Sequence, residues 1–170
     1  HMKSSVVISS YSEEWPRIFA QIREELFTVF SSTNTQIEHI GSTAVIGLCA
    51  KPVIDILLGA NALSDIESKI TSLEALGFDY ISKYEKEIPT RRYFVKSPAN
   101  SLRIHLHGLE IGSRIWCEHL RFRDLLRADS ALRSEYQQLK RRLAAQYVDD
   151  KAAYTDAKAP FIQSVLKTSS

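Results

Sequence analysis

The chain has 170 residues, of which 44% are hydrophobic and 25% are charged, and its formal net charge at pH 7 is +2. This length suits one domain with its own core, and the two fractions are typical of a water-soluble globular protein. No apolar run approaches the ~20 residues of a membrane-spanning helix, and the small charge does not point to nucleic acid, so we expect neither a membrane nor a nucleic acid as partner.

The start of the chain and its cysteines predict a compartment. His1–Lys3 lacks the apolar core of a signal peptide and looks like the remnant of a cleaved tag before Met2. Cys49 and Cys117 lie far apart and match no metal-binding spacing. We therefore expect reduced thiols in a cytoplasmic protein.

The first part of the chain reads as a helix followed by two strands. Apolar residues recur at helical spacing over 13–30, and Ser12 is a suitable N-cap. Gln36–Ile40 predicts a strand, and Val53–Leu58 predicts a more buried strand because it is almost wholly apolar.

A second helix and three further strands are expected next. Ser64–Leu76 predicts a helix, with Ser64 and Glu67 as a capping box and Gly77 at its end. The three strand candidates after it are Phe78–Ser82, Arg92–Lys96 and Leu102–Leu109. The gaps between them are too short for crossover helices, so these later strands should pair antiparallel.

The rest of the chain is helical in pattern. Three helices are expected, at Ser113–Ala128, Ser130–Tyr147 and Asp150–Leu166. Their apolar stripes need a partner surface, so 113–166 should be a helical C-terminal subdomain within one domain spanning 1–170. The fold class that follows is α+β, with a small mixed sheet, flanking helices and a helical C-terminal part.

The segment 37–56 carries the clearest functional signal. Gly41 and Ser42 follow a strand and can present backbone N–H groups and a hydroxyl to an anion. Asp55 stands on the next strand among apolar neighbours, where it can hold Mg²⁺ beside that anion. The alternatives are a plain tight turn, and an ion pair of Asp55 with Lys51 or Arg92.

Two histidines on a later strand add a second signal. His105 and His107 are one residue apart and so share a face, while Ile104, Leu106 and Leu109 suggest that the other face is buried. Such a pair suits a metal ion or an anionic ligand, and the alternative is two solvated surface histidines. Of Arg91 and Arg92, which alternate, we expect Arg92 to face the site.

For three other sets of residues, the sequence allows or favours a structural role over a functional one. His39 either approaches the site or is a core histidine that has found its hydrogen-bond partner. Arg123 and Asp124 favour a salt-bridge network that anchors the C-terminal helices. The tyrosines recur at helical spacing with other apolar residues, which favours core packing over a stacking platform; they are Tyr136, Tyr147 and Tyr154.

One string of residues is far more specific than a bare Gly-Ser pair. It reads EHIGSTAVIG over 38–47 and continues as KPVIDI over 51–56. Matching blocks elsewhere are Tyr11, Trp15, Gly77-Phe78, Arg92-Tyr93-Phe94, His105-Leu106-His107, Phe122-Arg123-Asp124, Glu135-Tyr136, Leu139-Lys140, Tyr154 and Lys158. Together these blocks cover nearly the whole chain and resemble the GrpB family, within the nucleotidyltransferase-fold superfamily. Related domains are appended to some dephospho-CoA kinases.

The resemblance implies a site for phosphate and metal, but this chain lacks some of the carboxylates of such a site. In active nucleotidyltransferases the Gly-Ser turn holds phosphates, and three carboxylates bind two metal ions. Here Asp55 matches one acid, the position of the second acid holds Leu57, and the later strand offers the two histidines. The implied phosphate-binding residues are Gly41, Ser42, Thr43, Lys51 and Arg92. The implied catalytic and metal-binding residues are Asp55, His105 and His107, with Mg²⁺, Mn²⁺ or Zn²⁺.

Two functions of different class follow. The first is a nucleotidyltransferase-like enzyme that binds a nucleotide or other phosphate-bearing ligand with a divalent metal and transfers a nucleotidyl group to a small acceptor. The second is a non-catalytic or regulatory module that binds a nucleotide or a coenzyme-A-like ligand in the same pocket. The missing second acid favours the second function.

Overall fold

The computed structural model describes residues 5–168, so His1–Lys3 lies outside the described residues. A five-stranded sheet has the order β1-β2-β5-β4-β3. β2 and β5 run parallel, and every other neighbouring pair in this sheet is antiparallel, which confirms the mixed sheet and the antiparallel later pairs. The strands are β1 (Thr35–Ile40), β2 (Val53–Ala60), β3 (Asp79–Ile81), β4 (Arg92–Lys96) and β5 (Arg103–Glu110).

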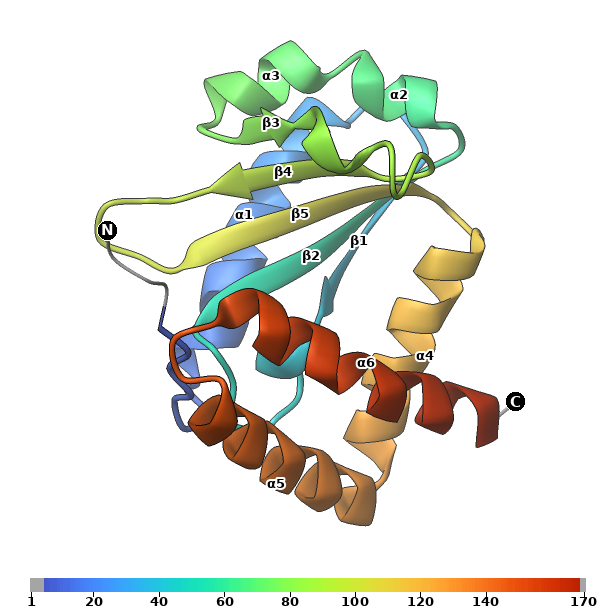
Figure 1. Ribbon diagram of the computed structural model, residues 1–170. Helices are drawn as coiled ribbons and strands as arrows, with labels where there is room; N and C mark the ends of the chain where they lie inside the picture. The colour runs from blue at the N-terminus through green and yellow to red at the C-terminus, as the bar shows by residue number, and fades with distance from the viewer. Residues whose placement is uncertain (1–4, 169–170) are drawn as a thin grey trace.

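Helices cover both faces of this sheet. Figure 1 shows α1 behind the sheet, with α2 and α3 beside β3 and β4, while α4, α5 and α6 gather on the other side near β1 and β2. The expected C-terminal helices are therefore present and cover part of one face. The helices are α1 (Glu14–Val29), α2 (Leu63–Glu67), α3 (Ile70–Ala75), α4 (Arg114–Ala128), α5 (Ser130–Gln146) and α6 (Lys151–Thr168).

The segment expected to form one helix over 64–76 forms two short ones instead. The Ser68 hydroxyl donates to the Asp65 carbonyl, and the Lys69 N–H donates to Ile66, only three residues back. Such local bonds compete with the regular helical pattern and end α2. The expected capping box does not form, because α2 begins after Ala62 with no side-chain cap. Gly77 does end α3, with a φ of 97°.

The N-terminal cap of α1 lies one residue later than expected. Glu13 occupies the cap position, and Ser12 still accepts a 3.2 Å hydrogen bond from the N–H of Glu14 through its hydroxyl. Ser12 therefore supplies the expected bond to an otherwise unpaired N–H group of the first turn.

The alternation along the strands sets which side chains meet. On β5, Ile104 and Leu106 are buried with residues of α1, α2 and α3, whereas His105 and His107 lie on the opposite face, where the His107 ring contacts that of His119 on α4. Leu109 shares the histidine face, contrary to expectation, since it is an even number of residues from both; Trp116 of α4 covers it. The site therefore lies on the face that the C-terminal helices partly cover.

None of the helices between residues 5 and 168 combines the length and the apolar character that crossing a membrane requires. Cys49 is buried and Cys117 is exposed, and both are free thiols.

Candidate functional site

The Gly-Ser turn joins β1 to a short 3-10 helix over Ser42–Ala44. Gly41 has a φ of 76° and a ψ of −178°, a backbone conformation that essentially only glycine adopts. A Cβ atom at Gly41 would also lie 2.8 Å from Oδ2 of Asp55. The turn therefore needs glycine both for its backbone and for the close approach of β2.

Hydrogen bonds of Thr43 and His39 connect this turn to the neighbouring strands. The Thr43 hydroxyl donates to the Val53 carbonyl at 3.1 Å and lies 3.0 Å from Nε2 of His39. Because that hydroxyl has one proton, His39 must be the donor in the second contact. Burial lowers the pKa of His39 to about 4, and its ring stacks on Phe19. His39 is thus a neutral core histidine, one of the two readings that its sequence position left open.

Asp55 lies between the two predicted histidines. Its Oδ1 is 3.5 Å from Nδ1 of His105 and 3.3 Å from Nε2 of His107. Burial by itself raises the pKa of Asp55, but hydrogen bonds from both histidines outweigh this effect and hold the pKa far below its ordinary value. Asp55 therefore pairs with the histidines, and neither Lys51 nor Arg92 forms an ion pair with it among the described residues.

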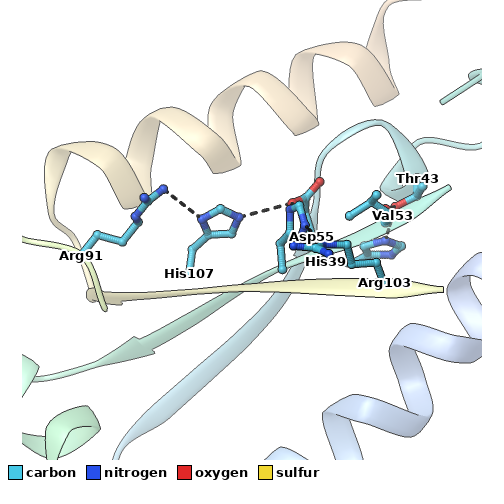
Figure 2. A network of polar contacts seen from close by, with 8 residues as sticks. His39, Thr43, Val53, Asp55, Arg91, Arg103 and His107 are labelled. Atoms are coloured by element: carbon cyan, nitrogen blue, oxygen red, sulfur yellow. Dashed lines mark hydrogen bonds and ion pairs between the residues drawn. The ribbon is translucent and has the colours of Figure 1, made fainter. Parts of the chain in front are cut away.

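Arg91, rather than Arg92, reaches this group. Figure 2 shows Arg91, His107 and Asp55 in one line of polar contacts, with Nη1 of Arg91 3.5 Å from Nδ1 of His107. Arg92 points to the opposite face of β4, where it pairs with Glu67 at 3.2 Å and with Glu85 at 3.7 Å. The expectation that Arg92 faces the site does not match its position, because Tyr93 takes the histidine side of the strand.

A cavity of about 180 Å³ opens beside Asp55, between the Gly-Ser turn and the C-terminal helices. It brings together four of the predicted phosphate residues, namely Gly41, Ser42, Thr43 and Lys51. It also contains side chains that sequence reasoning did not assign to a site. These are His119, Phe122, Arg123, Leu126, Tyr136, Lys140, Tyr154, Lys158 and Ile162. Several of these residues belong to the sequence blocks that carry the family resemblance, and that membership is the signal that could have assigned them to the site. Their helical spacing, which is typical of core packing, hid this signal.

Positive charge dominates the cavity. Lys51, Lys140 and Lys158 line it, and Asp55 is the carboxylate among its lining residues. Burial lowers the pKa of Lys140 to about 7 and that of Lys158 to about 8, with repulsion from neighbouring lysines adding to both shifts. Lys51 also has a lowered pKa, chiefly through burial.

These lysines differ in their partners. Lys140 is fully buried and donates to the Cys49 carbonyl. Lys51 and Lys158 both lie over the Tyr154 ring, at 5.3 and 4.7 Å from its centroid, and neither forms an ion pair within the described chain. The described lining of the cavity thus sets three lysines against Asp55 as its one carboxylate, and this excess of basic groups favours an anionic ligand.

Arg123 ties the cavity wall to the sheet. It lies 2.6 Å from Glu38 on β1, 3.2 Å from the His39 carbonyl and 2.9 Å from Asp124. This is the salt-bridge network expected from the sequence. It fixes α4 over the end of β1, next to the Gly-Ser turn.

The residues between 5 and 168 contain no cluster of three or more His, Cys, Asp or Glu side chains arranged to hold a metal ion. The position two residues after Asp55 is Leu57, which is fully buried with Ile40, Leu109 and Trp116. A single carboxylate such as Asp55 is nevertheless a ligand that Mg²⁺ uses, since this ion often binds one or two carboxylates together with the phosphates of a substrate.

Comparison with known proteins places the chain in a family. The sequence profile of the GrpB protein family matches residues 5–168. The chain belongs to the GrpB family. The glutamate-rich protein GrpB of Alkalihalophilus pseudofirmus is 34% identical over 168 residues, which cover 96% of this chain and 95% of that protein. The UPF0157 protein YqkA of Bacillus subtilis is 36% identical over 95% of this chain, which corresponds to 46% of that protein.

Solved structures extend the comparison to the fold. The crystal structure of the conserved protein GrpB from Enterococcus faecalis matches with a TM-score of 0.85 and 29% identity, over 95% of this chain and 96% of that one. The Cid1 poly(U) polymerase, in a structure described as Mg 3′-dATP bound, matches with a TM-score of 0.56 and 12% identity. That match covers 80% of this GrpB chain and 43% of the polymerase. The likeness confirms the nucleotidyltransferase-like fold.

Proposed function

We propose that the cavity binds the phosphate groups of a nucleotide or of another phosphate-bearing small molecule. The observation that carries this proposal is the meeting of three lysines with the Gly41-Ser42 turn around a single carboxylate. An ammonium group buried among other ammonium groups is costly unless an anion joins it. The fold of the polymerase neighbours, which bind nucleotides in their solved structures, supports the nucleotide in particular.

The size of the cavity limits what it can enclose. Its volume of about 180 Å³ is below the roughly 300–1,000 Å³ of pockets that bury whole drug-sized ligands. We therefore expect phosphate groups inside, with the remainder of the ligand extending outward. A divalent cation, Mg²⁺ or Mn²⁺ in preference to Zn²⁺, would join Asp55 and the phosphate oxygens and screen their mutual repulsion.

The single carboxylate favours binding over ordinary nucleotidyl transfer. Two divalent ions ~3.5–4 Å apart repel each other and need several anionic ligands. Leu57 cannot supply one. A non-catalytic or regulatory module for a nucleotide or a coenzyme-A-like ligand is therefore the function that we favour, and transfer to a small acceptor is the second candidate. We expect the cytoplasm as its compartment, where free thiols stay reduced.

Calorimetric titration tests the binding proposal. ATP, CTP, GTP, UTP, coenzyme A and inorganic tripolyphosphate are each titrated with and without Mg²⁺. We expect at least one of them to bind, and binding to fall about tenfold or more in Lys158→Ala, which removes one charge-assisted contact. Lys86→Ala, which changes an exposed lysine outside the cavity, is the matched control. No binding by any of these compounds would overturn the proposal.

A pyrophosphate-release assay separates the two candidates. ATP and CTP are incubated with Mg²⁺ or Mn²⁺ and a panel of small hydroxyl and amine acceptors, and we expect release at the background rate. Robust release that disappears in Asp55→Asn would make transfer the function.

A further inference from the structure

Each of the two histidines has an inner ring nitrogen, which faces Asp55, and an outer ring nitrogen, which points away from it. Both outer nitrogens face an arginine. Nε of Arg103 lies 3.0 Å from Nε2 of His105, and Nη1 of Arg91 lies 3.5 Å from Nδ1 of His107. A guanidinium group donates hydrogen bonds and never accepts them. Each outer nitrogen must therefore present a lone pair, and the single proton of each neutral imidazole must sit on the inner nitrogen.

The inner nitrogens both face the same oxygen. Nδ1 of His105 and Nε2 of His107 approach Oδ1 of Asp55, at 3.5 and 3.3 Å. With the protons placed by the arginines, both contacts are N–H groups that donate to a carboxylate oxygen.

This proton arrangement is the reverse of the one that a metal-binding histidine needs. A histidine that binds a metal offers the lone pair of its inner nitrogen and donates its outer N–H to a carboxylate or carbonyl. Here arginine donors stand where those acceptors would be, so the set of His105, His107 and Asp55 does not fit a three-ligand metal centre. The other oxygen of Asp55 has a different neighbour: Oδ2 faces Gly41, whose Cβ position would be 2.8 Å away.

We propose that His105 and His107 are positioning residues, which hold Oδ1 of Asp55 as N–H donors and leave Oδ2 as the oxygen presented to the cavity. Arg91 and Arg103 act through them by fixing the tautomers. Asp55 alone then contacts a cation that arrives with phosphate. Only this last step rests on the proposed function, because the tautomers belong to the free protein.

Nitrogen-15 NMR of the histidine rings tests the proposal without any ligand. Long-range proton–nitrogen correlations distinguish the Nδ1–H from the Nε2–H tautomer. At pH 7.5 we expect His105 as the Nδ1–H form and His107 as the Nε2–H form. Arg103→Met should release His105 into a mixture of tautomers while His107 stays unchanged. The opposite tautomer for either ring in the wild-type protein would overturn the proposal.

Isosteric variants test the same idea through metal binding. Asparagine places an N–H near the Nδ1 position of His105, and glutamine places one near the Nε2 position of His107. We expect His105→Asn and His107→Gln to keep the affinity of the wild-type protein for Mg²⁺ with tripolyphosphate within about threefold. The corresponding alanine variants should lose about tenfold or more, as expected on loss of hydrogen bonds to a charged group.

The ion Co²⁺ provides the contrasting readout. Four-coordinate Co²⁺ with histidine ligands absorbs strongly in the visible range, and we expect no such band to develop at one equivalent. Absorption that is lost in His105→Asn and in His107→Gln would show that the rings are metal ligands and would overturn the proposal. If tripolyphosphate does not bind at all, the proposed function fails, while the tautomer measurement still decides this inference.

Discussion

A Cβ atom on Gly41 would lie 2.8 Å from Oδ2 and 3.3 Å from Cβ of Asp55. The turn that follows β1 and the carboxylate of β2 are therefore in direct contact, although fourteen positions separate them in the chain. Ile40 and Asp55 are paired across the antiparallel ladder, so the sheet itself imposes this approach. The Gly-Ser turn and the Asp55 carboxylate are therefore packed together as one unit.

Gly41→Ala should abolish phosphate binding. The new methyl group must displace the Asp55 side chain, because real Cβ atoms essentially never come this close to another atom. Gly47→Ala is the matched control, since Gly47 also has a positive φ of 83° but no atom within 4 Å of its Cβ position. We expect Gly47→Ala to lose about 1–2 kcal/mol of stability through backbone strain and to keep its affinity for tripolyphosphate, measured by calorimetry. Equal affinities of the two variants would contradict the role of the turn.

The affinity for a phosphate ligand should fall as the pH rises from about 6.5 to 9. Lys140 and Lys158 lose their protons in the free folded protein at a pH of about 7 and about 8, against an ordinary pKa of 10.5. Fewer positive charges then remain to meet the anion. Titrations at constant ionic strength measure this slope. Lys158→Arg keeps its charge and should flatten the slope, whereas Lys86→Arg should leave it unchanged; an unaltered slope in Lys158→Arg would contradict the assignment.

The stability of the ligand-free protein should change in the opposite direction. An unfolded chain keeps its lysines protonated up to a pH of about 10.5, whereas the folded chain releases the Lys140 proton near pH 7 and the Lys158 proton near pH 8. The unfolded state therefore binds more protons across this window, so the free energy of unfolding rises with pH. Urea unfolding at pH 6.5, 7.5 and 8.5 checks the sign, and Lys140→Met should reduce the rise.

Arg123→Ala should detach α4 from β1. The guanidinium bonds to Glu38 and to the His39 carbonyl, and its side chain is only 11% exposed. We expect a loss of about 1–3 kcal/mol in the free energy of unfolding, since two partly buried acceptors lose a charged donor. Arg17→Ala breaks the fully solvated pair with Glu14 and should cost less than about 0.5 kcal/mol. Similar losses for both arginines would show that the network does not anchor the helix.

Residues 1–110 by themselves should not form a cooperatively melting domain. Without α4, the apolar side chains of Ile40, Leu57 and Leu109 lose their cover by Trp116. Gly59→Ala disturbs the packing of Trp116 on the sheet without removing α4, because the new Cβ atom would lie 2.6 Å from the Trp116 ring. We expect about 1–3 kcal/mol of destabilisation from this overpacking. A sharp thermal transition of the shortened chain, followed by circular dichroism, would show instead that 113–166 is dispensable for folding.

Most of the secondary structure could be predicted from the sequence, because hydrophobic periodicity and turn residues are properties of short segments of the chain. The period of the apolar residues located α1, the strands and the three C-terminal helices, and Gly77 located the end of α3. The expected single helix over 64–76 was wrong. The capping pattern of Ser64 and Glu67 does not form there, because α2 begins after Ala62, and the Ser68 hydroxyl bonds to the Asp65 carbonyl where the helix ends.

By itself the sequence determined the Gly-Ser turn, the approach of Asp55 and the shared face of His105 and His107. These depend on residue type, on glycine's backbone freedom and on the two-residue period of a strand. Only the tertiary structure decided that Arg91 reaches His107 and that Lys140 and Lys158 line the same cavity as Gly41. Alternation gives two faces but does not say which one the helices cover. A lysine on an amphipathic helix looks the same in sequence whether it faces solvent or a cavity formed by a strand a hundred residues away.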